Sequence, residues 1–477
     1  MQRQIDPGTG NTRICHMDAA RIDPNVIDLS PQSEPLPEVP TVAKTQIVVV
    51  GGGAGGLELA AKLSAKYNPR DYDIILLEKN RTHVWKPLLH EVAAGSLDAN
   101  LDEVGYRAHA HRWGFRFFLG RQMDIDRDRL EVIVAPLLDE DGQELIGEHR
   151  IRYDYLVIAV GSVSNDFGVT GVKQNCMALE SRRDADAFRS RLLNHCLKTS
   201  RRLSVDPSSD DMVRVGIVGA GATGVELAAE LYNAASSLGY NGLEVFDESR
   251  LKVTLIEASS RILPALPEKL SEAAHAELEA LGVEVITNAV VTEVTNTDIH
   301  TKDGAVIPAD LRVWAAGVKG PEFLRGIAGL ETNARDQLVV RDTLQTSFDD
   351  RIFAIGDCVE FIPNGETKPL PPRAQTAHQM ADTVFKNISA SIDERALKPF
   401  VYHDHGSLVS LSRFATVGSL MGNLIGGRMA VEGRLARFFY VSLYRLHLIA
   451  IHGWLRGIGL IITGHVNRIT RPKLKLH

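Results

Sequence analysis

An α/β fold with two Rossmann-like dinucleotide-binding domains, the second inserted in the first, is predicted by two glycine-rich turns. Each turn lies between an apolar run typical of a buried parallel strand and a segment with helical apolar spacing. The first such unit covers residues 46–63, and the second covers 213–231. The basic C-terminal end adds a third expected part, an amphipathic helical region.

The first unit carries the glycine pattern of a phosphate-binding turn. Gly51 allows the tight turn, Gly53 allows backbone N–H groups to approach a pyrophosphate, and Gly56 allows the helix to pack closely on the strand. The next expected strand, 74–77, ends in Glu78, at the position where a carboxylate hydrogen-bonds the ribose of an adenosine.

The second unit repeats this construction with Gly219, Gly221 and Gly224, and its second strand ends in Glu257. A carboxylate there favours NAD over NADP, because it accepts a hydrogen bond from a ribose 2′-OH and repels a 2′-phosphate. Arg261 lies close enough in sequence to leave NADP open.

Three further strand ends belong to the same pattern. Expected strands over 155–159 and 311–315 run into Gly161 and Gly317, where each dinucleotide domain would pass the chain onward. A short strand from 351 enters a turn at Asp357, whose carboxylate can hold a sugar or ribityl hydroxyl. Read alone, all three are ordinary strand ends and turns.

Composition excludes several classes of protein. The 477 residues predict about three domains, and 53 Lys and Arg against 60 Asp and Glu give a net charge of −7, which does not indicate nucleic-acid binding. The four cysteines show neither C-x-x-C nor metal-ligand spacing, so neither a metal site nor a dithiol redox pair is expected. Residues 1–43 contain many prolines and no signal-peptide pattern, and they predict a disordered extension.

Two nucleotide sites without a metal or nucleophile predict electron relay between a resident flavin and a visiting nicotinamide. From about Lys44 onward the chain resembles type II NADH dehydrogenase, the non-proton-pumping NADH:quinone oxidoreductase, in its proteobacterial form. That family belongs to the flavoproteins with two dinucleotide-binding domains. The resemblance lies in the order and combination of residues 82–95, 355–359, 371–379, 440–448 and 467–477.

The resemblance implies non-covalent FAD in the first unit, held by Gly51, Gly53, Gly56, Glu78, Lys86, Gly161 and Asp357. It implies NADH as substrate in the second unit, held by Gly219, Gly221, Gly224, Glu257 and Gly317. The expected domains are then 44–170 with 330–400 for FAD, 171–329 for NADH, and 401–477 for membrane association. Two electrons would pass from NADH through FAD to a membrane quinone of a respiratory chain, and no proton would cross the bilayer.

Four residues receive catalytic roles from the resemblance. Gln375 and Gln379 correspond to the element that lines the quinone pocket, although a helix start with solvent-facing amides would have the same pattern. Glu226 corresponds to the acid near nicotinamide and flavin, or is an ordinary first-turn carboxylate. Lys86 would stabilise charge on the reduced flavin, or is a simple loop lysine. Three histidines are weaker candidates for proton relay: His83, His90 and His378.

The C-terminal end has nine basic residues and one acid after residue 420. On one helical wheel the basic stripe opposes an apolar side, which predicts a helix lying on an anionic membrane; a core or dimer-forming helix is the alternative. Charges interrupt every apolar run before the roughly 18 residues needed to cross a bilayer. A peripheral protein on the cytoplasmic face of the inner membrane is expected, and a homodimer stays open. The stripe consists of Arg434, Arg437, Arg445, His452 and Arg456, with Arg468, Arg471, Lys473 and Lys475 following.

Two other functions are alternatives to this one. A soluble NADH-dependent ferredoxin or rubredoxin reductase would share both glycine turns but would not need the basic tail. A NAD-responsive interaction protein would bind nucleotide without sustained turnover. Disulfide reductases of the same superfamily need a cysteine pair that the chain lacks, and sulfide:quinone reductases usually lack an intact second glycine turn.

Overall fold

The computed structural model describes residues 44–97, 103–238, 248–411, 415–422, 427–432, 448–449 and 451–470, all within one compact unit, Lys44–His477. The predicted extension 1–43 lies outside the described residues. So do the side chains of most of the predicted basic stripe: Arg434, Arg437, Arg445, Arg468, Arg471, Lys473 and Lys475.

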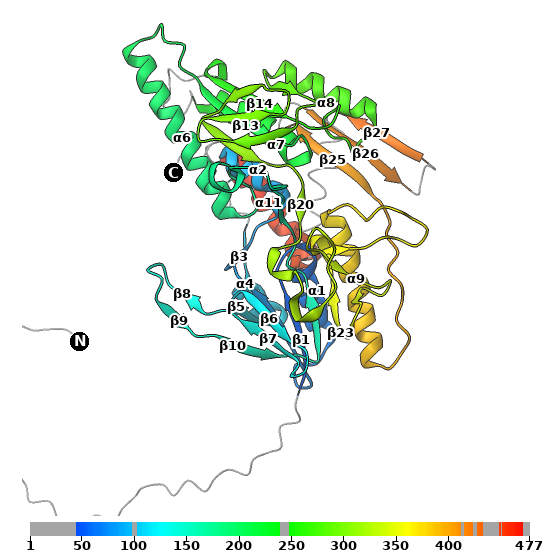
Figure 1. Cartoon of the computed structure of the whole chain (residues 1–477). Coiled ribbons are helices and arrows are strands. Elements are labelled where there is room, and N and C mark those ends of the chain that lie inside the picture. Colours follow the sequence, from blue (N-terminus) through cyan, green and yellow to red (C-terminus); the bar gives the residue numbers. More distant parts are fainter. Residues whose placement is uncertain are drawn as a thin grey trace, which may run out of the picture. The chain divides into compact units, whose positions relative to one another are not determined.

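The first sheet has the order β22-β23-β11-β1-β2-β5. Its strands are parallel apart from β22, and the central residues 47–50 are at most 3% exposed, as a run of β-branched residues covered on both faces requires. Helices α1 and α9 pack against each other beside this sheet (Figure 1). The bounds are β1 Thr45–Val50, β2 Tyr72–Glu78, β5 Arg116–Leu119, β11 Tyr155–Ile158, β22 Gln345–Thr346, β23 Asp349–Ala354, α1 Ala54–Lys66 and α9 Ala374–Ile392.

The second sheet, drawn in green in Figure 1, has the order β15-β14-β13-β19 and is parallel throughout. This order matches β5-β2-β1-β11 of the first sheet strand for strand. The α/β prediction is therefore confirmed, with a parallel sheet at each glycine turn. The bounds are β13 Val213–Val218, β14 Leu251–Ile256, β15 Glu284–Ile286, β19 Leu311–Trp314, α6 Arg182–Val205, α7 Ala222–Leu238 and α8 Glu268–Ala280.

The chain crosses between the sheets at several points. All strands of the second sheet lie in sequence between β11 and β23, so the first sheet is built from two separate segments. Helix α2 follows the first two strands but packs against α6 and α7 beside the second sheet. The segments that contain these crossings, with their neighbouring elements, are β3 Thr82–His83, η1 Lys86–Leu88, α2 Leu89–Ala94, β4 Val104–Gly105, α4 Tyr106–Trp113, β12 Val163–Ser164, α5 Val172–Asn175 and β20 Val318–Lys319.

Small antiparallel sheets complete the two units. They are β6 Gln122–Asp126, β7 Glu131–Val134 and β10 His149–Arg152; β8 Leu137–Leu138 and β9 Glu144–Ile146; and β16 Val291–Val294, β17 Asp298–Thr301 and β18 Val306–Pro308. Short strand β24 Val359–Glu360 directly follows the turn η6 Gly356–Cys358 and pairs in parallel with β21 Leu338–Val339.

The expected membrane-associating region, 401–477, begins with a sheet and not with a helix. Strands β25 Gly406–Leu411, β26 Ala415–Gly422 and β27 Gly427–Glu432 form an antiparallel sheet that packs on α7 and α8. Val409 and Leu411 are buried in the core of the second unit, and their period-two spacing is that of a strand with one buried face.

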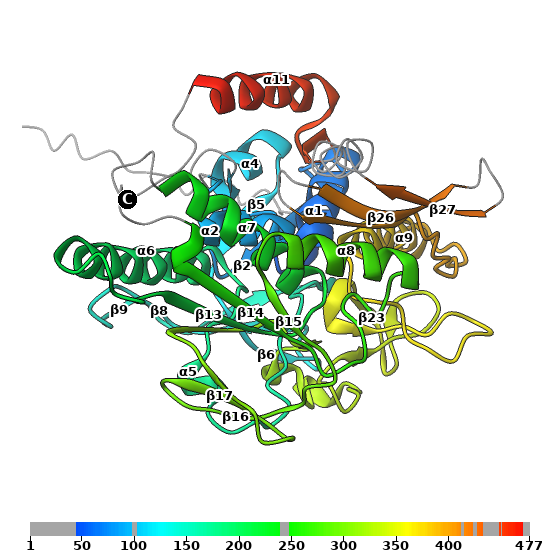
Figure 2. The same ribbon diagram turned by 90° about the horizontal axis from the view of Figure 1, so that it is seen from above.

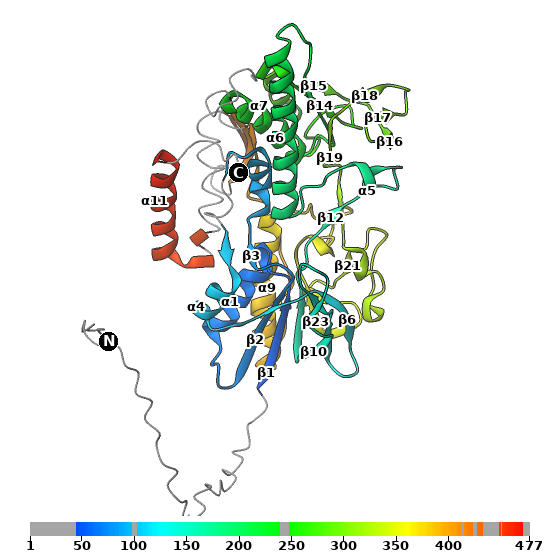
Figure 3. The same ribbon diagram turned by 90° about the vertical axis from the view of Figure 1, so that its left-hand side faces the viewer.

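The prediction of one helix through residues 434–456 is also wrong at Gly453. This residue has a φ of +76°, a left-handed conformation that ends one helical segment before α11, Trp454–Thr470, begins. Before the break, Arg112 and Trp113 of α4 donate to the carbonyls of His452 and Ile451. Figures 2 and 3 both show α11 to one side of the two sheets, next to α4.

Candidate functional site

The predicted site residues of the first unit converge because they follow adjacent parallel strands. Gly51 follows β1, Gly161 follows β11, and Asp357 follows β23. The carboxyl ends of neighbouring parallel strands share one edge of a sheet, where doubly wound folds bind their ligands.

The turn after β1 is a bare backbone cradle. Gly51 has a φ of +101°, and a Cβ there would lie 2.3 Å from the Ala159 carbonyl oxygen. A Cβ on Gly56 would lie 1.9 Å from the Gly51 oxygen, so helix and turn touch through backbone alone. At Gly53, by contrast, a Cβ would meet no described atom within 4 Å, and no described side chain caps α1. Open space in front of uncapped N–H groups suits a phosphate.

Glu78 reaches this cradle from the end of β2. Its Oε2 accepts a hydrogen bond from the Gly52 N–H at 2.7 Å, and its Oε1 accepts from the Asn80 backbone and side chain at 2.9 and 2.7 Å. The carboxylate is thus held at the edge of the turn, where its predicted ribose contact would be made.

The second unit has the same construction. Gly219 has a φ of +102°, and a Cβ on Gly224 would lie 2.0 Å from the Gly219 oxygen, whereas one on Gly221 would meet no described atom within 4 Å. Glu257 accepts from the Ala220 N–H and from the Ser259 N–H, both at 2.8 Å. The two cradles therefore match residue for residue.

The Arg261 guanidinium, which left NADP open in the sequence, is bound to its own loop. It donates to the carbonyls of Pro264 at 3.0 Å and Leu266 at 2.8 Å. Gly317 follows β19 with a φ of +74°, and the Phe167 ring covers it so closely that a Cβ there would lie 2.8 Å from Phe167 Cζ.

Lys86, Ser162 and Asp357 form a chain of contacts from three elements. The Lys86 ammonium donates to the Ser162 carbonyl at 3.3 Å, and the Ser162 hydroxyl donates to Asp357 Oδ2 at 3.1 Å. Burial raises the pKa of Asp357, and the Ser162 hydrogen bond and the Lys86 charge offset part of that rise. The structure thus brings Lys86 to Gly161 and Asp357, although more than 70 residues separate Lys86 from either.

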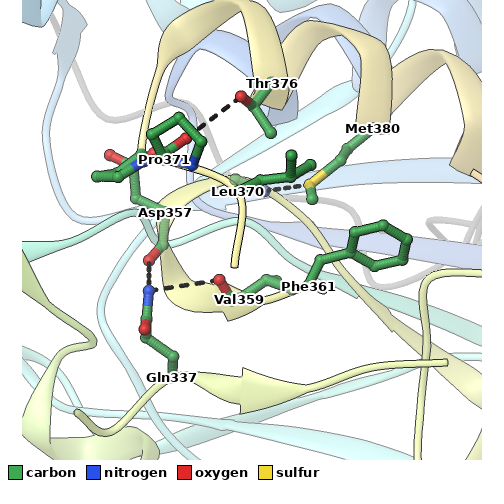
Figure 4. Close-up of a pocket in the computed structure, with 10 residues that line it drawn as sticks. Gln337, Asp357, Val359, Phe361, Leu370, Pro371, Thr376 and Met380 are labelled. Carbon is green, nitrogen blue, oxygen red and sulfur yellow. Dashed lines mark hydrogen bonds between the residues drawn. The ribbon is translucent and has the colours of Figure 1, made fainter. Parts of the chain in front are cut away.

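A pocket lies beside Asp357, between η6 and the start of α9 (Figure 4). Gln337 donates to the carbonyls of Asp357 at 3.0 Å and Val359 at 3.3 Å, and Met380 Sδ accepts from the Gly356 N–H at 3.3 Å. These contacts hold the turn that carries Asp357. The bare cradle, Glu78 and this polar pocket fit a dinucleotide at the first sheet.

Glu226 lies at the crossing between the two units. Its carboxylate is buried, and His90 Nδ1 of α2 lies 3.5 Å from its Oε2. Burial lowers the pKa of His90 to about 4 despite a backbone hydrogen bond with Pro87, so the ring is neutral near pH 7. Because α2 directly follows the loop of Lys86, Glu226 is brought close in the fold to that loop.

The amides of Gln375 and Gln379 both bind the backbone before β25. Gln375 accepts from the His405 N–H at 3.1 Å and donates to the Gly406 carbonyl at 3.0 Å. Gln379 accepts from the His403 N–H at 2.9 Å and donates to its carbonyl at 2.8 Å. The amides therefore clamp α9 to the following segment, and their contact with quinone stays a prediction.

One buried carboxylate was not predicted from the sequence. Glu58 lies on the buried face of α1 and bonds His378 of α9. The signal was a charged residue within the apolar helical pattern of residues 57–63.

The described helices include none with the length and apolar character needed to cross a bilayer. On α11, however, large apolar side chains face solvent. Trp454 is 66% exposed, Leu455 is 72% exposed, and Ile462 is 59% exposed.

Comparison with known proteins agrees with the fold. Residues 45–381 match the model of the pyridine nucleotide-disulphide oxidoreductase family. The chain is 47% identical over 443 residues to a type II NADH:quinone oxidoreductase of Haemophilus influenzae, covering 90% of this chain and 99% of that relative. It is 31% identical to a Staphylococcus aureus protein of the same description, covering 81% and 92%.

Solved structures share the fold at lower identity. The structure of NDH2 from Plasmodium falciparum in complex with NADH has a TM-score of 0.76 at 19% identity and covers 91% of this chain and 100% of its own. The sulfide:quinone oxidoreductase of Aquifex aeolicus has a TM-score of 0.67 at 19% identity, covering 89% and 95%. On the sequence relatives and the family match, the chain belongs to the type II NADH:quinone oxidoreductases within the pyridine nucleotide-disulphide oxidoreductase family.

Proposed function

We propose that this protein transfers two electrons from NADH through bound FAD to a membrane quinone of a respiratory chain, without pumping protons. The observation that carries the proposal is the pair of matching cradles in one compact unit, each with an acid bound to its turn. Two dinucleotide sites suit a relay between a resident and a visiting cofactor.

FAD is assigned to the first cradle because the additional polar groups gather there. The uncapped start of α1 would hold the pyrophosphate, Glu78 the adenosine ribose, and Asp357 a hydroxyl of the ribityl chain. When bound, FAD accepts two electrons from a nicotinamide and gives them to a quinone. The Lys86 ammonium, anchored on Ser162, supplies positive charge near the end of that site.

NADH is assigned to the second cradle. Glu257 would accept from a ribose 2′-OH, and its charge disfavours a 2′-phosphate. The binding of Arg261 to its own loop supports the same preference, because its guanidinium is already engaged. Glu226, buried at the crossing between the units, would orient the nicotinamide against the first site.

The quinone is proposed to enter from a membrane that α11 touches. Trp454, Leu455 and Ile462 expose apolar surface that a soluble reductase would not need. The start of α9, with Gln375 and Gln379, would form part of the quinone pocket. The protein would then be peripheral, on the cytoplasmic face of the inner membrane and bound to anionic lipid.

Anaerobic stopped-flow absorbance near 450 nm tests the proposal. NADH should bleach the flavin rapidly, NADPH should bleach it far more slowly, and a short-chain quinone should restore the colour. A purified protein without flavin would overturn the central assignment. Bleaching that quinone cannot reverse, but ferredoxin can, would favour the soluble reductase.

A further inference from the structure

A row of charged side chains runs from the surface of α1 and α9 into the protein. Asp382 and Lys62 are partly exposed and form an ion pair, Lys62 also pairs with Glu58 one turn earlier, and Glu58 Oε2 bonds Nδ1 of His378. The side chain of Glu58 is 7% exposed, whereas that of Asp382 is 50% exposed. The row therefore joins a buried carboxylate to solvent.

Burying the Glu58 carboxylate costs desolvation free energy that packing does not repay. Glu58 sits between Leu57 and Leu59 on a helix whose neighbours are buried, and removing a charge from water is unfavourable unless partners compensate. Burial raises the pKa of Glu58, but its bonds to His378 and Lys62 outweigh that effect and leave the pKa below its usual value. The group is thus an anion that His378 faces.

His378 occupies a distinctive place on α9. It lies between Gln375 and Gln379 in the segment proposed for quinone, and its ring stacks on Trp85 with centroids 5.9 Å apart and planes at 29°. Trp85 directly precedes Lys86, so the ring lies between the loop of the first site and the carboxylate of α1. The His378 side chain is 24% exposed.

We propose that His378 donates to the quinone the one proton that each turnover takes from solvent, and that Glu58 positions its ring for this transfer. This inference rests on the proposed function. NADH + H⁺ + quinone gives NAD⁺ + quinol, so NADH supplies both electrons and one hydrogen while one proton comes from solvent. The transferred proton is one that His378 has taken from solvent on Nε2, because Nδ1–H is bound to Glu58. The Nε2–H bond breaks, a quinol O–H bond forms, and solvent then returns a proton to Nε2.

Glu58 orients the His378 ring, as a buried carboxylate orients the histidine of a catalytic triad. By accepting from Nδ1–H, the carboxylate selects the ring tautomer and fixes the orientation of the ring. Lys62 holds the opposite oxygen of Glu58 and keeps the carboxylate in place. Glu58 is a positioning residue, and His378 is the catalytic one.

Other charged groups around the ring leave this arrangement intact. On α9, Asp382 is paired with Lys62, and at its start Arg373 pairs with Asp404 at 3.3 Å. His83 of β3 also faces His378, but burial lowers the pKa of His83 to about 4, so it is neutral near pH 7. Glu58 is therefore a negative charge that contacts the ring directly.

The test separates the two half-reactions of the full-length holoenzyme by stopped flow. His378→Gln should slow reoxidation by a short-chain quinone about a hundredfold and Glu58→Gln about tenfold, while NADH bleaches the flavin within twofold of the wild-type rate. Reoxidation by ferricyanide, which takes electrons without protons, should be unchanged in both.

A readout independent of turnover is the ¹⁵N spectrum of the histidine rings, with His378 identified by its loss in His378→Gln. Wild type should hold the proton on Nδ1, and Glu58→Gln should show a mixture of tautomers. The matched control is the solvent-exposed pair His275 and Glu279 of α8, 3.3 Å apart, whose Gln variants should change none of these quantities.

The outcomes distinguish the inference from the proposed function. If quinone fails to reoxidise wild type, the proposed function fails. If wild type is reoxidised but both variants match it in quinone rate, the inference is overturned. Equal slowing with quinone and ferricyanide would also overturn it, because the defect would then lie in the flavin site. If Glu58→Gln fails to fold, His378→Gln and its ferricyanide control decide alone.

Discussion

Gly53 and Gly56, which belong to the same turn, should respond differently to the same added methyl group. In Gly56→Ala the new Cβ would lie 1.9 Å from the Gly51 carbonyl oxygen, so turn and helix must separate. In Gly53→Ala the methyl meets no described atom within 4 Å, and the backbone, with φ of −69°, accepts any residue. One change therefore damages the fold, and the other only fills the proposed pyrophosphate site.

The magnitudes follow from these contacts. Overpacking costs about 1–3 kcal/mol, and because backbone meets backbone at Gly56 the upper end applies. At about 2–4 °C per kcal/mol, Tm of the flavin-free Gly56→Ala protein should fall by about 6–12 °C. Gly53→Ala changes only a helix cap, which costs about 1 kcal/mol or less.

The assay is thermal unfolding of the flavin-free proteins with and without added FAD. At a thousandfold excess over Kd, FAD should stabilise wild type by about 4 kcal/mol, and Gly53→Ala should lose this shift while its own Tm stays within a few degrees. A Gly53→Ala protein that retains wild-type flavin occupancy would refute the placement of the pyrophosphate at this turn.

Three further predictions follow from the site and the surface. Glu257→Ala should raise KM for NADH about tenfold to a hundredfold, because a charged hydrogen bond to the ribose is lost, and should reduce the preference for NADH over NADPH. Steady-state kinetics with both nucleotides measure this, and an unchanged ratio of the two kcat/KM values would contradict the assignment. Burial lowers the pKa values of His83 and His90 to about 4, against 6.5 in the unfolded chain, so the unfolded chain binds more protons below pH 6.5. Each histidine should therefore lower the free energy of unfolding by up to about 3 kcal/mol as the pH falls from 6.5 to 4. Urea unfolding at pH 7 and pH 5 checks the sign, and equal stability at both would argue against buried neutral rings. The double variant Trp454→Ser, Leu455→Ser should bind anionic vesicles more than tenfold more weakly than wild type. Its Tm should be unchanged, because both side chains face solvent. Sedimentation with vesicles measures the binding, and unchanged binding would mean that α11 does not insert into the membrane.

The sequence by itself predicts what depends on neighbours along the chain. A glycine's place after an apolar run determines the turn, and the acid at the next strand end follows from the same short unit. The two cradles and the strands at Gly51 and Gly219 are therefore found where the pattern puts them. The strands over 406–432 were not predicted, because the face that they bury is defined only by their packing on α7 and α8.

Tertiary structure decided the contacts between distant segments. The bond from Ser162 to Asp357 depends on β11 and β23, which lie side by side although they are far apart in sequence. The bond from Glu58 to His378 depends likewise on α1 packing against α9 across 320 residues. A local sequence pattern cannot predict such pairs. Their stability comes from burial and charge compensation, which exist only after the helices and sheets have packed.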